Sequence, residues 1–307
     1  MSTVVASPTA RDTHVLYSSK PPGQATTEIF RMSIDGSDPV RLTADPTVEH
    51  LWPRPSPDGT KILFYTAVAG SSVTDIDTNN LWVMDSDGSN QRMLLADGAY
   101  GWTRQGHVEW SPDGTQLVMS AGDSMTTDIY VTDAEARGPR KVSNRVANMA
   151  IDPSWTPDGR GILFIGCPAG SVTCWWWDYE VFRLDVATGA EQRLTYDSFA
   201  DFDPYMSPDG SQIVWLRCTG MFPFGPWSIF RASTVQVPLS AQVVLDDGNI
   251  NSSVDFSFDG STLLFTRHQI GLTTWQSAAT IGVDGSRLGF LRGRPAPVGE
   301  GAPVYWP

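Results

Sequence analysis

Residues 110–120 read WSPDGTQLVMS, a proline-aspartate-glycine turn followed by an apolar run of strand length. Close variants of this stretch begin at Ser56, Thr156, Ser207 and Ser257 and read SPDGTKILFYT, TPDGRGILFIG, SPDGSQIVWLR and SFDGSTLLFTR. The turn aspartate therefore recurs every 45 to 55 residues. A repeat of this length indicates an architecture built from copies of one supersecondary unit.

The two ends of the chain carry complementary parts of one further repeat. Residues 303–307, PVYWP, resemble the segment that precedes each turn, and residues 12–18, DTHVLYS, resemble the run that follows a turn. Six repeats result if the two ends meet. We therefore expect one sheet to combine the last strand of the chain with the first ones.

Each repeat holds four runs of strand length, which we name A to D in chain order. In the second repeat they are residues 51–55, 61–65, 80–84 and 92–95. The B runs are apolar on both faces, as in a sheet packed between two neighbours, and no stretch has helical periodicity. We expect residues 1–307 to form a single all-β domain, a six-bladed β-propeller with four antiparallel strands per blade. Its ring is closed by the C-terminal strand A joining the N-terminal strands B to D. A β-sandwich is the alternative, but it leaves the complementary ends unexplained.

The repeats also carry a family resemblance. The phrase around each turn, the strand IYVTD at residues 129–133 and the endings RLT at residues 41–43 and 193–195 resemble the WD-repeat-like units of the TolB family propeller. The resemblance covers nearly the whole chain, and the matching residues are turn and core positions. It therefore implies the fold and leaves the function open. Similar propellers precede the catalytic domain in prolyl oligopeptidase relatives, but no GxSxG motif occurs in this chain.

Charge and hydrophobicity exclude several kinds of partner. The 21 basic residues against 34 acidic ones give a net charge of −13, which would repel nucleic acid and an anionic membrane surface. No stretch of eighteen apolar residues occurs, and the first residues lack the pattern of an export signal. We expect a soluble, cytoplasmic protein; a periplasmic or secreted protein is the alternative if a signal had been removed.

Three cysteines are present, at positions 167, 174 and 218. Cys167 and Cys174 could close a loop in an oxidising compartment. Reduced thiols are the favoured expectation, in keeping with a cytoplasmic protein.

In a propeller, the A–B and C–D turns lie on one side of the ring, here called the turn face, and the B–C and D–A connections lie on the other, the loop face. The first set is short and repetitive, whereas the second is long and differs in every repeat, which marks the loop face as functional. Its loops are rich in aromatic residues: Trp102, Trp175, Trp176, Trp177, Phe222, Phe224 and Trp227. We expect them to bind an apolar small molecule or a protein partner. The alternative is that some of these rings fill gaps between blades.

Strand A should line the central channel, and its residues follow a register set by the turn. Six residues before the turn aspartates stand Trp52, His107, Asp152, Asp203 and Ser253. Two residues earlier stand His50, Gln105, Ala150, Asp201 and Asn251. Because side chains alternate along a strand, both rows are expected to share one orientation.

One imidazole and two carboxylates, those of His107, Asp152 and Asp203, thus occupy equivalent places in three successive blades. This combination predicts a divalent-cation site, with calcium as the candidate, or a group for acid-base catalysis. The structural alternative is that the two aspartates accept backbone amide bonds from a neighbouring blade. No motif requires a cofactor.

Two functions follow. The first is a binding propeller with ligand contacts at the channel mouth, to which the inner strands contribute His50, Trp52, Glu109, Asp201 and Asn251. The second is an enzyme at the same mouth, a hydrolase, lyase or cyclase acting on an apolar metabolite, with His107, Asp152 and Asp203 as catalytic residues.

Overall fold

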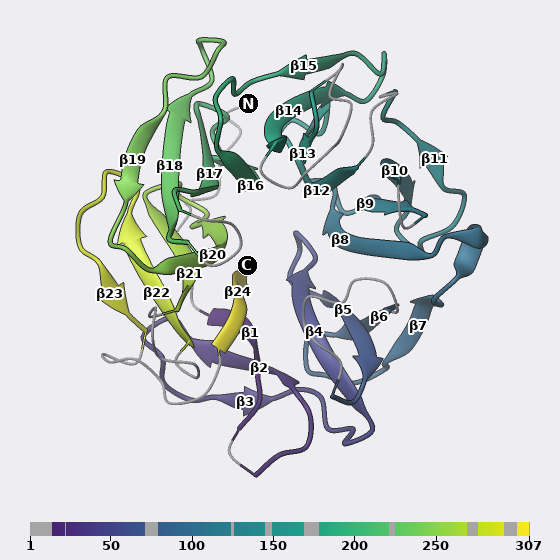
Figure 1. Cartoon of the computed structure of the whole chain (residues 1–307). Coiled ribbons are helices and arrows are strands. Elements are labelled where there is room, and N and C mark those ends of the chain that lie inside the picture. The colour runs from purple at the N-terminus through teal and green to yellow at the C-terminus, as the bar shows by residue number, and fades with distance from the viewer. Residues whose placement is uncertain are drawn as a thin grey trace, which may run out of the picture.

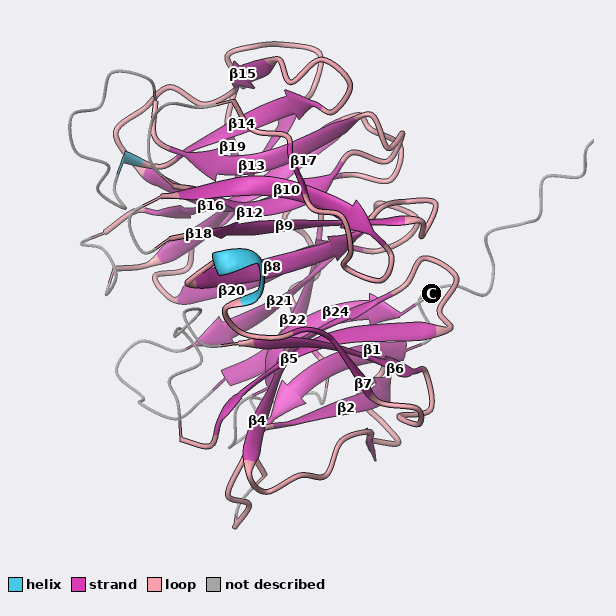
Figure 2. Cartoon of the chain, turned by 90° about the vertical axis from the view of Figure 1, so that its right-hand side faces the viewer, coloured by secondary structure: helices cyan, strands magenta, loops and turns pink. Residues whose placement is uncertain are grey.

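The computed structural model describes residues 14–21, 23–70, 79–123, 126–144, 149–168, 178–220, 225–268, 276–291 and 300–306. Strands make up nearly all of the regular structure, with a 3-10 turn at Ala99–Gly101 (Figure 2). The sheets stand around a central axis and form an all-β propeller (Figure 1). The all-β propeller expected from the repeats is confirmed.

Four of the sheets hold four strands each. They comprise β24 (Glu300–Trp306), β1 (His14–Ser19), β2 (Glu28–Ser33) and β3 (Val40–Arg41); β4 (Val48–Pro55), β5 (Lys61–Val68), β6 (Asn80–Asp85) and β7 (Arg92–Leu95); β8 (Arg104–Trp110), β9 (Gln116–Gly122), β10 (Thr127–Asp133) and β11 (Arg140–Lys141); and β12 (Ala150–Trp155), β13 (Gly161–Gly166), β14 (Glu180–Asp185) and β15 (Glu191–Arg193).

The fifth sheet has eight strands. They are β16 (Ala200–Met206), β17 (Gln212–Cys218), β18 (Trp227–Ser233), β19 (Gln242–Leu245), β20 (Ile250–Phe256), β21 (Thr262–His268), β22 (Gln276–Gly282) and β23 (Gly289–Phe290). A single parallel pair, Trp227 opposite Ile250, joins its first four strands to its last four.

The inner strands β4, β8, β12, β16, β20 and β24 contact one another in turn around the axis, and β24 contacts β4 again (Figure 1). β24 pairs antiparallel with β1, with Tyr305 opposite Val15 and Val304 opposite Leu16. The two ends of the chain therefore meet in one sheet, and the expected closure of the ring is confirmed.

The hydrophobic core lies between neighbouring sheets. On β5, the buried side chains of Leu63 and Phe64 belong to different clusters, one shared with β8 and β9 and the other shared with β1 and β24. Successive residues of strand B thus point to opposite faces, and both faces are covered. Burying each such side chain contributes about 2 kcal/mol, which explains why the B runs are apolar throughout.

Each A–B turn is held by its serine or threonine and its aspartate. Ser56 Oγ donates to Asp58 Oδ1 at 2.6 Å, and the Thr60 backbone N–H donates to the same oxygen at 3.0 Å. Gly59 has a φ of 70°, a conformation that costs glycine little. The same bonds recur at Asp113, Asp158, Asp209 and Asp259. The repeated phrase is therefore a structural turn.

Cys167 is disulfide-bonded, so the expectation of reduced thiols is wrong for this residue. Cys218 is a buried free thiol. Among the described segments, none forms an apolar helix of the length that a membrane crossing requires.

Candidate functional site

A β-bulge interrupts every inner strand at the same place. Along β4 and β5 the pairing passes from Leu51 opposite Tyr65 to Arg54 opposite Leu63, so two residues of β4 face one of β5. Equivalent register shifts occur in β8, β12, β16 and β20. The first residue inside each bulge has a positive φ between 46° and 54°; these are Trp52, His107, Asp152, Asp203 and Ser253, here called the bulge row.

The sixth inner strand, β24, has a bulge at the same place. Its register shifts between the Leu16–Val304 and Ser18–Gly301 pairs, so Ala302 stands first inside the bulge and Pro303 second. Proline is also the second bulge residue at positions 53, 153 and 204.

The bulge breaks the alternation of side chains, because an extra residue re-aims the chain. The bulge row keeps partial exposure at Trp52, His107, Asp203 and Ser253, whereas the row two residues earlier is buried. The two rows therefore differ in exposure, except at Asp152, which is buried like the earlier row. The sequence count found the correct positions but not the left-handed backbone that separates the rows.

The earlier row binds neighbouring protein groups. His50 Nδ1 lies 3.0 Å from Glu28 Oε2. Asp201 accepts two bonds from the Arg217 guanidinium, at 2.7 and 3.0 Å, and one from Trp215 Nε1. Asn251 Nδ2 donates to the Trp227 carbonyl at 2.8 Å. These placements give His50, Asp201 and Asn251 structural roles and do not favour the ligand contacts predicted for them.

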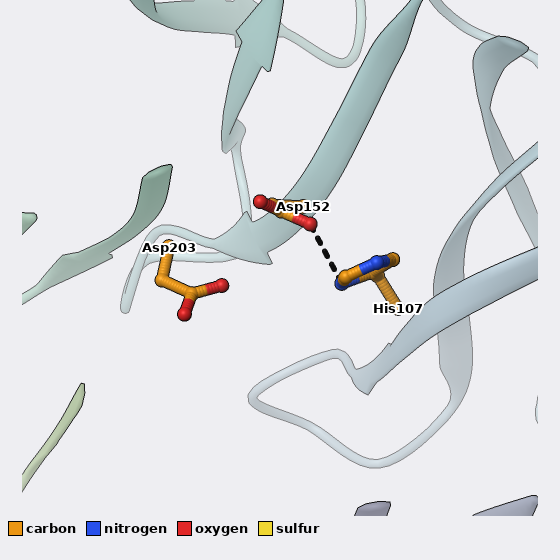
Figure 3. A group of neighbouring side chains, drawn as sticks. All are labelled: His107, Asp152 and Asp203. Atoms are coloured by element: carbon orange, nitrogen blue, oxygen red, sulfur yellow. Dashed lines mark ion pairs between the residues drawn. The ribbon is translucent and has the colours of Figure 1, made fainter. Parts of the chain in front are cut away.

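His107, Asp152 and Asp203 converge from β8, β12 and β16 (Figure 3). One nitrogen or oxygen atom from each lies within 4.8 Å of the other two. His107 Nδ1 is 2.7 Å from Asp152 Oδ1, and the two groups form an ion pair when the imidazole is protonated. Asp203 Oδ2 accepts the Ser253 backbone N–H at 3.3 Å. Asp203 thus accepts a backbone amide bond from a neighbouring blade, which is the structural role offered as the alternative. Among the described residues, no backbone amide donates to Asp152 Oδ1.

Burial and charge act in opposite directions on these groups. Burial lowers the pKa of the His107 imidazole, but the carboxylates of Asp152 and Asp203 more than offset it and raise this pKa above its ordinary value. Burial, together with the nearby Asp152 carboxylate, raises the pKa of Asp203 to about 6. The three groups form one interacting set that can exchange a proton or share a cation.

Trp52 forms the aromatic wall of this set. Its indole stacks on the His107 ring with centroids 6.1 Å apart and planes 22° apart, and its edge meets Tyr65. A φ of 52° is costly for so bulky a residue. Strain of this kind persists only where the surroundings impose it, and it often marks a functional position.

Nearer the turn face, a second polar group crosses the axis. Arg54 Nε donates to Glu109 Oε1 at 2.5 Å, and the Tyr205 hydroxyl donates to the same oxygen at 2.8 Å. With Asp255 they line a cavity of about 30 Å³. Burial and the Glu109 carboxylate raise the pKa of Asp255 to about 7. Glu109, predicted as a ligand contact, is thus bound within the protein. Arg54, Tyr205 and Asp255 were missed, although each stands two residues after a bulge position.

The predicted aromatic residues are only partly described. Trp102 is buried against Tyr130 and Tyr100, and Trp227 is half-buried and packs on Phe202. Predicted contacts that lie outside the described residues are Trp175, Trp176, Trp177, Phe222 and Phe224.

Two exposed aromatic side chains, Tyr196 and Phe199, lie in a D–A loop and were not predicted as contacts. Tyr196 is 56% exposed and Phe199 is 44% exposed, and the guanidinium groups of Arg193 and Arg217 lie over them. The signal was present in the segment YDSF between strands D and A.

The types of atom that His107, Asp152 and Asp203 offer indicate which metal ion they could bind. Calcium takes six to eight oxygen ligands, whereas this set offers one imidazole nitrogen and two carboxylates. Imidazole with carboxylate suits manganese, iron or zinc better. The residues fit a divalent cation, but the donor chemistry does not favour the predicted calcium.

Comparisons with known proteins agree with this architecture. A family model described as the TolB beta propeller domain matches residues 103–293. An uncharacterised protein of Agrobacterium fabrum is 24% identical over 161 residues, 52% of this chain and 48% of that protein. The chain therefore spans about half the length of this curated relative.

Solved structures share the fold at low identity. TolB from Acinetobacter baumannii matches with a TM-score of 0.72 and 19% identity, over 96% of this chain and 67% of that one. An oligogalacturonate lyase in complex with manganese matches with a TM-score of 0.57 and 16% identity, over 83% of this chain and 70% of that one. TolB and a lyase thus both resemble this chain in fold.

Proposed function

Because the chain belongs to the TolB beta propeller domain family, we propose that it is a binding protein that captures an apolar small molecule or a protein partner on its loop face, at the mouth of the channel. The bulge row carries this proposal. Its strained positions present Trp52, His107, Asp152 and Asp203 beside the axis, while the Arg54–Glu109–Tyr205 group lies beyond them. A partner entering from the loop face would meet an aromatic wall and an acidic centre.

The exposed rings Tyr196 and Phe199 support contact with a partner on the same face, since aromatic side chains are enriched in binding surfaces. Trp175 to Trp177, Phe222 and Phe224 lie outside the described part of the chain and remain proposed contacts.

Site-directed photocrosslinking in the source cells tests this proposal. A benzoylphenylalanine at position 199 should trap a discrete partner, and native mass spectrometry of the purified protein should detect a bound small molecule if the ligand is not a protein. The control carries the same group at exposed Ser89, in a turn of the turn face. Equal crosslinking from both positions, or no partner and no ligand by either method, contradicts the proposal.

Catalysis at the same mouth is the second candidate. The His107–Asp152 pair, with Asp203 opposite, has the geometry of a general base held by a carboxylate. The reaction would be that of a hydrolase, lyase or cyclase on an apolar metabolite. A panel of esters and lactones with apolar substituents would test it. Turnover that is lost in His107→Asn supports an enzyme, and the absence of turnover across the panel counts against one.

We also infer that the ring has six blades. The eight-stranded sheet then counts as two blades, because among the described residues one parallel residue pair is the only strand pairing between the two sets of four strands. Each set has its own inner strand, β16 or β20, with its own bulge.

The disulfide at Cys167 favours a location in an oxidising compartment, periplasmic or extracellular, rather than in the cytoplasm. Thiol titration of protein taken from its native compartment tests this inference. Cys218 should be the only reactive thiol after unfolding, whereas three reactive thiols would contradict it.

A further inference from the structure

We propose that His107, Asp152 and Asp203 bind one divalent transition-metal ion, of the manganese, iron or zinc class. The site deepens the proposed function by giving the channel mouth a charged centre, but metal binding needs no partner. The two proposals can therefore fail separately.

The first argument is geometric. The three donor atoms lie within 4.8 Å of one another, which is the separation available to ligands that share an ion at about 2.0 to 2.4 Å. They come from three neighbouring inner strands, β8, β12 and β16, so a bound ion would tie three parts of the ring together. The side chains face one another across the same space (Figure 3).

The second argument is the state of Asp152. Its side chain is only 7% exposed, and among the described residues the His107 imidazole, with Nδ1 2.7 Å away, is the contact of Oδ1 (Figure 3). Burying a carboxylate costs free energy unless its charge is compensated, and one imidazole here stands beside two carboxylates. A metal ion at this place would compensate the remaining charge.

The third argument is the support around the donors. The Ser253 N–H is directed at Asp203 Oδ2, and the Trp52 ring lies against the His107 imidazole. Groups that orient metal ligands in this manner tune affinity in known sites. The left-handed backbone at all three donors fixes where each side chain starts.

The selectivity follows from the donor types. One nitrogen and two carboxylates leave coordination positions open for water or for a group of a bound ligand, as in metal sites that bind a substrate. Calcium and magnesium prefer oxygen donors and should bind more weakly. A ligand of the channel mouth should therefore carry an oxygen atom that can complete the coordination of the metal ion.

The experiment uses the purified full chain, stripped with EDTA and titrated calorimetrically with Mn²⁺, Zn²⁺, Ca²⁺ and Mg²⁺. We expect one equivalent of Mn²⁺ or Zn²⁺ to bind at least tenfold more tightly than Ca²⁺. The variants His107→Asn, Asp152→Asn and Asp203→Asn should each weaken it at least tenfold. Asparagine tolerates positive φ, so the backbone is kept.

The matched controls are His268→Ala, which removes a half-buried histidine of β21, and Asp255→Asn, which removes a half-buried carboxylate elsewhere on the axis. Both should bind metal like the wild type. Nitrogen coupling in the pulsed EPR spectrum of bound Mn²⁺ should vanish in His107→Asn. Absence of binding, a preference for Ca²⁺, or unchanged affinity in folded site variants would overturn the proposal.

Discussion

At the scale of single residues, the backbone at the bulge row decides which side chains reach the axis. Counting from the turn located Trp52, His107, Asp152 and Asp203, because the bulge lies at the same distance from the turn aspartate in each of these strands. The count could not reveal the left-handed conformation, since none of these residues is a glycine, the usual signal for positive φ. For this reason Asp201 and Asn251 were placed with the wrong neighbours.

Ser253 allows the strain of the bulge to be measured. Ser253 has a φ of 54°. Ser253→Gly should raise the free energy of unfolding by about 1 kcal/mol, because glycine lacks the Cβ that disfavours this conformation. The neighbouring Ser252→Gly, on ordinary strand backbone, should lower it by about 0.5 to 1 kcal/mol. Urea denaturation gives both values, and a loss of stability in Ser253→Gly would contradict the bulge.

Asp255 predicts a pH dependence of stability. Burial and Glu109 raise its pKa in the folded state to about 7, from an ordinary value of 3.8. The folded protein therefore holds this proton more tightly than the unfolded chain, and stability falls as the pH rises between these two values. From pH 5 to pH 8 the wild type should lose about 2 kcal/mol more than Asp255→Asn. Parallel stability curves for the two proteins would show that the pKa is not raised.

At the scale of elements, the repeated turn explains why the sequence was informative about the fold. In each copy one aspartate oxygen accepts a hydroxyl and a backbone bond, so the same letters recur wherever strand A turns into strand B. Strand bounds followed closely: β7 was expected at 92–95 and is Arg92–Leu95, whereas β4 begins at Val48, three residues before the expected start. The loops share no repeated sequence. Their aromatic residues could therefore be assigned to the loop face, but the contacts of each side chain could not be predicted.

Ser111 tests the turn. Its hydroxyl donates to Asp113 Oδ1 and accepts the Gln116 N–H at 2.9 Å, and its side chain is buried. Ser111→Ala should therefore lower the free energy of unfolding by about 1 to 3 kcal/mol. Ser89→Ala, at an exposed position of a C–D turn, should change it by less than about 0.5 kcal/mol. Similar values for the two variants in chemical denaturation would remove the structural role assigned to the turn.

At the scale of the whole molecule, the pairing of β24 with β1 holds the ring together. The complementary ends of the sequence predicted it, because no other arrangement gives each end its missing strands. Val304, Tyr305 and Trp306 are buried by this pairing and complete two of the hydrophobic clusters.

Removal of residues 300–307 should therefore open the ring. The loss of three buried side chains corresponds to about 6 kcal/mol at roughly 2 kcal/mol each. We expect cooperative unfolding to shift to much lower urea, and a synthetic peptide of residues 298–307 to restore part of the loss by adding a strand to β1. A truncated chain that unfolds like the wild type would disprove the closure.

The central claim is that three bulges bring His107, Asp152 and Asp203 to one point on the axis. Anomalous diffraction from a crystal soaked in Mn²⁺ tests it most directly. The account predicts one strong peak at about 2.0 to 2.4 Å from a His107 nitrogen and from both carboxylates, with positive φ at all three residues. A peak elsewhere, or an extended backbone that turns these side chains between the sheets, would contradict it.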